Sequence, residues 1–382
     1  MVDFLKMTED QKWEFIAGMY ERWDAEDAPE NRELILSYNE KVSPEAIKLH
    51  KEALIIDACT FNVTRFGWRL NAAGATALNC TVPDVFGEMG DAFKAIANYY
   101  QVVRADPRFK LIRTPEDILD AKKAGQTGLI IGAQSPSFIT GYDPESVLEA
   151  FCTLGLRVMQ IGYNYRTFAA DGCFSPVNAG LSDTGIEFVK LMEKYHVTVD
   201  LSHCGERSTL EAMDLAEKPQ IFSHSNPLKL FNHPRNITDE QAKKCAATGG
   251  VVGVSTYNVT LWDGKNFPTI NTFLDCLCYY CDLLGVEHVG IGLDTTATEG
   301  CYSRAEIQYF TKLIRKVSGE GAVAYRAFSE GKHSVNAYSI EGLACLANWV
   351  NLIDGMIKRG FSEQEIRLLA GENWLRVFRE TW

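Results

Sequence analysis

Long apolar runs are missing from this 382-residue sequence. Its longest apolar stretches, such as Gly128–Ala133, fall well short of the roughly 20 residues that a membrane-spanning helix needs. The opening residues MVDFLKMTEDQKWEF carry acidic side chains and lack the apolar segment of a secretory signal. We therefore expect a soluble, cytoplasmic protein that has no membrane partner.

Positive charge is also scarce. Lys and Arg number 38 against 50 Asp and Glu, which gives a formal net charge of −12. Nucleic acids and anionic membranes bind basic surfaces, so the balance argues against both as partners. A local positive pocket for a small anionic substrate remains compatible with this composition.

Paired cysteines with the spacing of a zinc ribbon do not recur among the 11 cysteines. In a cytoplasmic protein an odd number of scattered cysteines indicates reduced thiols in the core. Cys278 and Cys281 fit one face of a helix and are interpreted as packing residues. The sequence also contains no internal repeat and no low-complexity segment.

What the sequence does contain is a regular alternation of short apolar runs and longer amphipathic stretches. Strands buried on both faces of a parallel sheet have such runs. Eight of them alternate with helices, which predicts a (β/α)₈ TIM barrel. A doubly wound sheet is the main alternative, but segment 57–61 lacks the glycine-rich turn typical of that fold. The predicted strands are Ala53–Asp57, Ala75–Thr81, Leu129–Ala133, Arg157–Ile161, Val197–Ser202, Gln220–Ser223, Val251–Ser255 and Val289–Leu293.

The two ends of the chain have helical patterns. We expect residues 1–50 to form an N-terminal helical extension and residues 51–382 to form the barrel with its C-terminal helices. Those last helices are predicted over Ile340–Arg359 and Ser362–Arg379.

Two histidines stand out because TIM barrels place their chemistry at the C-terminal ends of the strands. Of seven histidines, His203 and His224 follow adjacent predicted strands at equivalent positions. Imidazole is a common zinc ligand, and Asp294 after the last strand could close the same site. The other five histidines are interpreted as structural.

The segments around these residues resemble the membrane dipeptidases, peptidase family M19, from about Leu54 to the C-terminus. Members of that family are binuclear zinc hydrolases on a (β/α)₈ barrel that cleave dipeptides and related amides. The resemblance implies that His203 and His224 bind one metal ion, that Arg235 clamps a substrate carboxylate and that Asp294 is an acid–base residue. The matching segments are GLSDTGIEFVKLMEKYHVTVDLSHC, IFSHSNP, HPRNITDEQ, GGVVGVS, LGVEHVGIGLD and RGFSEQEIRLLAGENWLRVF.

The second metal site departs from the family pattern. The family's His-x-Asp pair after the first strand is replaced by Cys59 and Phe61, and its bridging Glu by Gln134. Tyr163 stands where membrane-bound members have a histidine. Phenylalanine cannot bind a metal, and neutral glutamine is a poor bridge between two cations. We therefore expect at most one zinc ion per chain.

Three functions fit these residues. The first is a metal-dependent, dipeptidase-like hydrolase acting on a small amino-acid- or dipeptide-like carboxylate, with zinc bound by His203 and His224 and by Asp294 or Cys59. A single zinc ion can lower the pKa of a water to about 7, so hydrolysis does not require two. Arg235 would then bind the carboxylate.

The second function is metal-free acid–base chemistry on the same barrel, as in an isomerase, a lyase or a biosynthetic tailoring enzyme. His203 or His224 would be the base, and Tyr163 or Tyr257 the acid. Cys59 remains open as a ligand, a nucleophile or a packing residue.

The third function is that of a non-catalytic barrel that binds an amino-acid-like ligand or a protein partner. Tyr257 and Gln134 are further candidates for substrate binding, and the family commonly forms dimers, which leaves a homodimer open.

Overall fold

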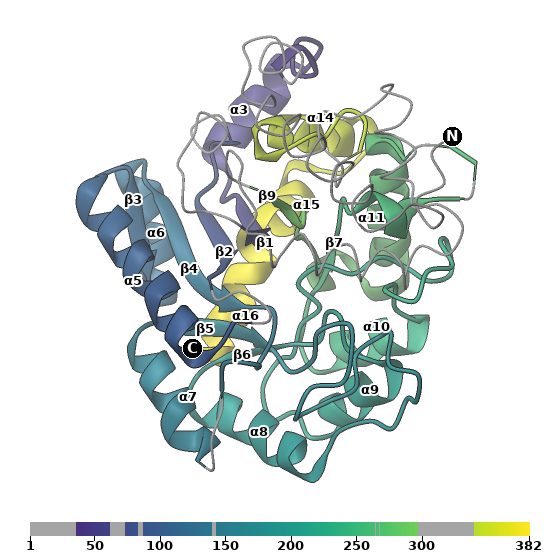
Figure 1. Ribbon diagram of the computed structural model, residues 1–382. Helices are drawn as coiled ribbons and strands as arrows, with labels where there is room; N and C mark the ends of the chain where they lie inside the picture. The colour runs from purple at the N-terminus through teal and green to yellow at the C-terminus, as the bar shows by residue number, and fades with distance from the viewer. Residues whose placement is uncertain are drawn as a thin grey trace, which may run out of the picture.

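The computed structural model describes residues 36–61, 73–82, 87–139, 143–263, 265–266, 268–296 and 340–382. Its strands curve into a barrel that is surrounded by helices (Figure 1). One sheet has the order β6-β5-β4-β2-β1-β9, with β3 also paired to β4, and a second sheet pairs β7 with β8. The strands are β1 (Ile56–Phe61), β2 (Ala77–Thr81), β3 (Phe109–Ile112), β4 (Thr127–Ala133), β5 (Leu156–Gln160), β6 (Thr198–Asp200), β7 (Val252–Val254), β8 (Val289–Ile291) and β9 (Thr295–Thr296).

A short extended segment joins the two sheets on one side. Asp200 at the end of β6 forms a parallel bridge with Ile221, and Phe222 forms a parallel bridge with Val252 in β7. Residues 221–222 therefore occupy the position of a strand between β6 and β7.

The other side closes where the chain leaves β8 beside β1. The backbone N–H of Leu293 donates to Asp57 Oδ1 at 3.1 Å, and that of Asp294 donates to the Cys59 carbonyl at 3.0 Å. All strand pairs among these elements are parallel. Each of the eight predicted runs contributes a member of this ring, which confirms the TIM-barrel prediction.

The helices begin and end where local sequence signals favour it. The Ser182 and Thr238 side chains accept backbone N–H groups at the starts of α8 and α10, and Gly285 ends α11 with a positive φ of 88°. The helices are α3 (Pro44–Glu52), α5 (Met89–Ala105), α6 (Pro115–Ala124), α7 (Pro144–Thr153), α8 (Asp183–Lys194), α9 (Glu206–Asp214), α10 (Asp239–Ala247), α11 (Ile270–Leu284), α14 (Trp349–Lys358), α15 (Glu363–Arg367) and α16 (Asn373–Thr381).

The C-terminal helices close the end of the barrel at which the strands begin. Asn373 Nδ2 of α16 donates to the carbonyl of Val289, the first residue of β8, at 2.8 Å, and Trp382 Nε1 donates to Oγ1 of Thr198, the first residue of β6, at 2.9 Å. A Cβ at Gly290 would lie 2.6 Å from the Trp374 ring, so only glycine fits at this point of β8. We therefore expect the site residues at the opposite end, where the strands end.

Some boundaries differ from the prediction. The helix expected from Ile340 begins at Trp349, after a bridge and a short 3₁₀ turn. Strand β3 was not predicted, because its four residues FKLI do not form a continuously buried run.

Only the end of the predicted N-terminal extension is described, because residues 1–35 lie outside the described part. Helix α3 lies beside α14 (Figure 1), and the Ser43 N–H before it donates to Asp354 Oδ1 at 2.9 Å. No helix among the described residues is long and apolar enough to cross a membrane.

Candidate metal and active site

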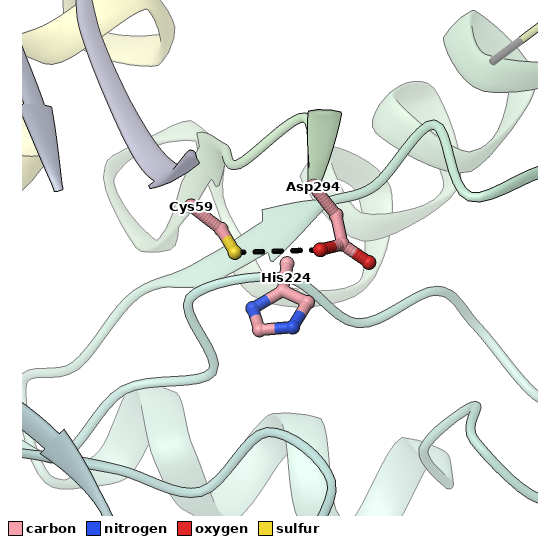
Figure 2. A group of neighbouring side chains, drawn as sticks. All are labelled: Cys59, His224 and Asp294. Carbon is pink, nitrogen blue, oxygen red and sulfur yellow. Dashed lines mark hydrogen bonds between the residues drawn. The ribbon is translucent and has the colours of Figure 1, made fainter. Parts of the chain in front are cut away.

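Three predicted residues from distant parts of the chain meet at the strand ends. Cys59, His224 and Asp294 each offer a ligand atom, and these atoms lie within 4.8 Å of one another (Figure 2). Cys59 Sγ lies 3.5 Å from Asp294 Oδ1. Gln134, which follows β4, donates its Nε2 hydrogen to Cys59 Sγ at 3.0 Å. The sequence therefore identified residues that the fold brings together.

The two predicted histidines face each other. His203 Nε2 and His224 Nε2 are 2.9 Å apart, and both side chains are buried. Each ring uses its other nitrogen elsewhere: His203 Nδ1 contacts Asn164 Oδ1 at 2.7 Å and His224 Nδ1 contacts Ser223 Oγ at 2.6 Å. Tyr163 stacks on His203 with ring centroids 4.2 Å apart. Both imidazoles are therefore held with their Nε2 atoms facing each other.

The backbone around this point is unusual. Asn164, His203 and Asp294 have φ values of 61°, 67° and 55°, in the left-handed region that residues other than glycine rarely adopt. Such strain persists where the surrounding structure enforces it, and it concentrates at functional sites. The surrounding structure therefore holds these three residues in backbone conformations that they would rarely adopt otherwise.

Burial sets the charge of the site. It lowers the pKa of His203 and of His224 well below the usual range, and the nearby Arg235 charge adds to this effect. It also raises the pKa of Asp294, and the pKa of Cys59 rises through burial and then through the Asp294 charge. The imidazoles are therefore neutral, which is the form that binds metals.

Among the described residues, Cys59, His224 and Asp294 have ligand atoms close enough together to hold one metal ion, and His203 reaches this group through its contact with His224. Tetrahedral ligands at about 2.0–2.3 Å from zinc lie roughly 3.3–3.6 Å from each other. The 2.9 Å between the two Nε2 atoms and the 3.5 Å between Cys59 Sγ and Asp294 Oδ1 are close to that range. In addition, both Nδ1 atoms have the outer hydrogen-bond partners that are typical of metal-bound histidines.

A second ion does not fit the same residues. Gln134 directs an amide N–H, a donor, at Cys59 Sγ, so this group has no oxygen pointing at a shared cation there. Phe61 carries no ligand atom. The described residues therefore provide one candidate metal site rather than two.

A pocket lies beside this site. Arg235 is 6% exposed and donates to the His224 carbonyl at 2.8 Å and to Ser225 Oγ at 3.0 Å. Among the described residues no carboxylate lies within ion-pair distance of its guanidinium, so this buried cation suits an anionic ligand. Tyr257 also lines the pocket, and its pKa is raised by burial and by the Asp294 charge. The full lining is His224, Ser225, Asn226, Arg235, Asn236, Ser255, Tyr257, Thr260 and Asp294.

His233 provides a pH-dependent contribution to stability next to this pocket. Its Nδ1 accepts the Arg235 backbone N–H at 3.2 Å, and burial followed by the Arg235 charge lowers its pKa to about 4. The unfolded chain, with a histidine pKa near 6.5, binds more protons between these values, so stability is lost as pH falls from about 6.5 to 4. We expect His233→Asn to reduce this loss by about 1–3 kcal/mol in urea unfolding at pH 4.5 and 7.5. Equal pH dependence in both proteins would contradict the assignment.

Sequence reasoning missed the residues that hold the site residues in place. Asp57 Oδ1 accepts the backbone N–H of Cys59 at 3.0 Å and that of Leu293 at 3.1 Å, and burial raises the Asp57 pKa to about 7. Asp200 and Ser223 hold His224 in a similar way. Asp200 Oδ1 accepts the Ser223 backbone N–H, and Ser223 Oγ contacts His224 Nδ1. The available signal was that both aspartates end an apolar strand two or three residues before a site residue.

Curated proteins are similar to this chain in sequence. The chain is 23% identical over 295 residues to dipeptidase tcpJ of Claviceps purpurea, covering 76% of this chain and 60% of that protein. It is 27% identical over 278 residues to dipeptidase verJ of Clonostachys rogersoniana, covering 72% and 61%. The chain thus spans about three fifths of the length of these curated relatives.

Solved structures have a similar fold. An amidohydrolase from Pseudomonas aeruginosa matches with a TM-score of 0.76 and 29% identity over 88% of this chain and 99% of that one. A metallo peptidase from Rhodobacter sphaeroides, liganded with a phosphinate mimic of L-Ala-D-Ala, matches with a TM-score of 0.68 and 19% identity over 86% and 99%. The model of the membrane dipeptidase family matches residues 75–326, which include His203, His224, Arg235 and Asp294. The chain therefore belongs to the membrane dipeptidase family, peptidase family M19.

Proposed function

We propose that this protein is a dipeptidase-like hydrolase with a single zinc ion, and that it acts on a small amino-acid- or dipeptide-like carboxylate. The observation that carries the proposal is the pair of buried imidazoles whose Nε2 atoms face each other at 2.9 Å. Family membership supports the reaction class. Replacement of the second ion's ligands by Cys59, Phe61 and Gln134 supports one ion rather than two.

His203, His224 and Cys59 would hold the ion. When bound, zinc supplies Lewis-acid polarisation of a carbonyl and lowers the pKa of a water. Asp294 accepts a proton from the attacking water and returns it to the leaving amine, a role that its raised pKa suits. Arg235 binds the substrate carboxylate, and Tyr257 lines the same pocket.

One observation favours the metal-free alternative. Tyr257 is half-buried and lines the same pocket as Asp294, so the two would supply an acid and a base without an ion. An isomerase or lyase would use such a pair with His224 as base. Turnover that survives complete removal of zinc by a chelator would select this alternative.

A hydrolysis assay tests the proposal. Metal-free protein is prepared with a chelator, reconstituted with zinc, and incubated with dipeptides and N-acylated amino acids. We expect hydrolysis of at least one carboxylate-bearing amide only after zinc is restored, and none of the corresponding carboxamides. Failure on every substrate with zinc present, or equal rates without zinc, would contradict the proposed function.

Arg235→Lys separates substrate binding from chemistry. Lysine keeps the positive charge but loses the two-pronged geometry, so we expect KM to rise about ten- to a hundredfold while kcat changes little. Arg376→Lys is the matched control, because Arg376 also donates to two backbone carbonyls but belongs to α16, at the opposite end of the barrel. A fall in kcat with unchanged KM in Arg235→Lys would contradict the clamp.

A further inference from the structure

Asp200 is buried at the end of β6 and accepts four hydrogen bonds. Its Oδ1 accepts the backbone N–H groups of Ser202 and Ser223, each at 3.0 Å. Its Oδ2 lies 3.0 Å from Gln160 Nε2 and 2.5 Å from Ser223 Oγ. Three of these four partners are N–H groups, which can only donate, and the Ser223 hydroxyl donates to Asp200 Oδ2 as the fourth.

The direction of that bond determines the next one. Because the Ser223 hydroxyl hydrogen is directed at Asp200, Ser223 Oγ can only accept from His224 Nδ1, 2.6 Å away. The hydrogen of the neutral His224 ring is therefore on Nδ1. Nε2, which faces His203 Nε2, keeps its lone pair.

We propose that Asp200, acting through Ser223, is a positioning residue that keeps the hydrogen of His224 on Nδ1 and leaves Nε2 free to bind a cation. This deepens the proposed function, on which its zinc-binding part rests. The arrangement extends the carboxylate–histidine pairing of metal sites by one hydroxyl. It assigns a chemical role to two residues that contact neither the ion nor the substrate.

Asp57 provides an internal control. It ends the apolar part of β1 as Asp200 ends β6, and its Oδ1 also accepts two backbone N–H groups, from Cys59 and Leu293. Its Oδ2, however, meets Trp349 Nε1 at 3.4 Å instead of a serine next to a histidine. Each aspartate therefore accepts two backbone N–H groups through Oδ1. Only Asp200 also accepts from the serine next to His224, and this is the bond that would set the His224 tautomer.

The test compares Asp200→Asn with Asp57→Asn. Asparagine keeps an oxygen for the two backbone N–H groups, but at position 200 its NH₂ group faces the Ser223 hydroxyl. Ser223 must then accept from the amide and donate to His224 Nδ1, which moves the ring hydrogen to Nε2. Two-bond ¹H–¹⁵N correlation spectra of histidine-labelled, metal-free protein distinguish the two tautomers, and a His224→Asn variant assigns the signal.

We expect the Nδ1–H form of His224 in the wild type and in Asp57→Asn, and the Nε2–H form in Asp200→Asn. Zinc affinity should fall about 10- to 100-fold in Asp200→Asn, as for other outer partners of metal-bound histidines, and clearly less in Asp57→Asn, where the asparagine oxygen keeps the two backbone bonds. If Asp200→Asn does not fold, Ser223→Ala replaces it. That variant keeps both backbone bonds to Asp200, removes only the hydroxyl, and should lose the pure Nδ1–H form.

An unchanged tautomer in Asp200→Asn or Ser223→Ala would overturn the proposal, as would an Nε2–H form in the wild type. Equal losses of zinc affinity in Asp200→Asn and Asp57→Asn would also overturn it, because they would indicate general loosening of the strand ends. Absence of zinc binding by the wild type would contradict the proposed function alone. The spectra of metal-free protein would still decide the role of Asp200.

Discussion

His224→Ala should abolish tight zinc binding and lower kcat by a factor of about 10³ or more. The ring is 1% exposed and contributes one of the two facing Nε2 atoms, so alanine removes a ligand that no neighbour replaces. Elemental analysis of the purified variant and steady-state kinetics measure the two effects.

The control for this variant is His288→Ala. His288 contacts the Gly250 carbonyl through Nδ1 at 2.9 Å and precedes β8, at the end of the barrel away from the site. It should keep both its zinc and its kcat. Retention of a full equivalent of zinc by His224→Ala would refute its role as a ligand.

Asp294→Asn should lower kcat by about 10²–10⁴-fold while KM and zinc content stay close to the wild-type values. The carboxylate is half-buried and desolvation raises its pKa, which suits a proton carrier, whereas an amide cannot take up a proton. Asparagine is the substitution of choice, because Asp294 has a φ of 55° and asparagine tolerates this conformation better than alanine.

Two outcomes would contradict the assignment of Asp294. Unchanged kcat would show that another group carries the proton. Loss of zinc from Asp294→Asn would show that the carboxylate is a ligand, a role that its 3.5 Å separation from Cys59 Sγ also allows.

Much of this fold could be predicted because the barrel strands have a simple signature. Runs such as Leu129–Ala133 and Val289–Leu293 are apolar on both faces, since sheet neighbours and helices cover them, and the structure places each in the ring. Strand β3 escaped prediction for the opposite reason. Its two central residues, Lys110 and Leu111, have intermediate exposure, so the segment lacks the continuous apolar run by which the other strands were predicted.

For the candidate site, the sequence could predict only which residues lie at the strand ends, and not how their side chains are hydrogen-bonded. Spacing relative to the strands placed His203 and His224 side by side, because adjacent parallel strands end at the same rim. Spacing carries no information about hydrogen-bond direction, which depends on the rotamers of Ser223 and Asp200. It also could not show that Gln134 donates to Cys59 Sγ, and the role of Cys59 remains a prediction.

Zinc titration of metal-free wild-type protein measures directly how many ions the chain binds. A competing chromophoric chelator reports both affinity and stoichiometry. We expect one tightly bound equivalent per chain, and a triple variant that restores the family's ligands (Cys59→His, Phe61→Asp and Gln134→Glu) should gain a second. Two tight equivalents in the wild type, or none, would contradict a single zinc site formed by His203, His224 and Cys59.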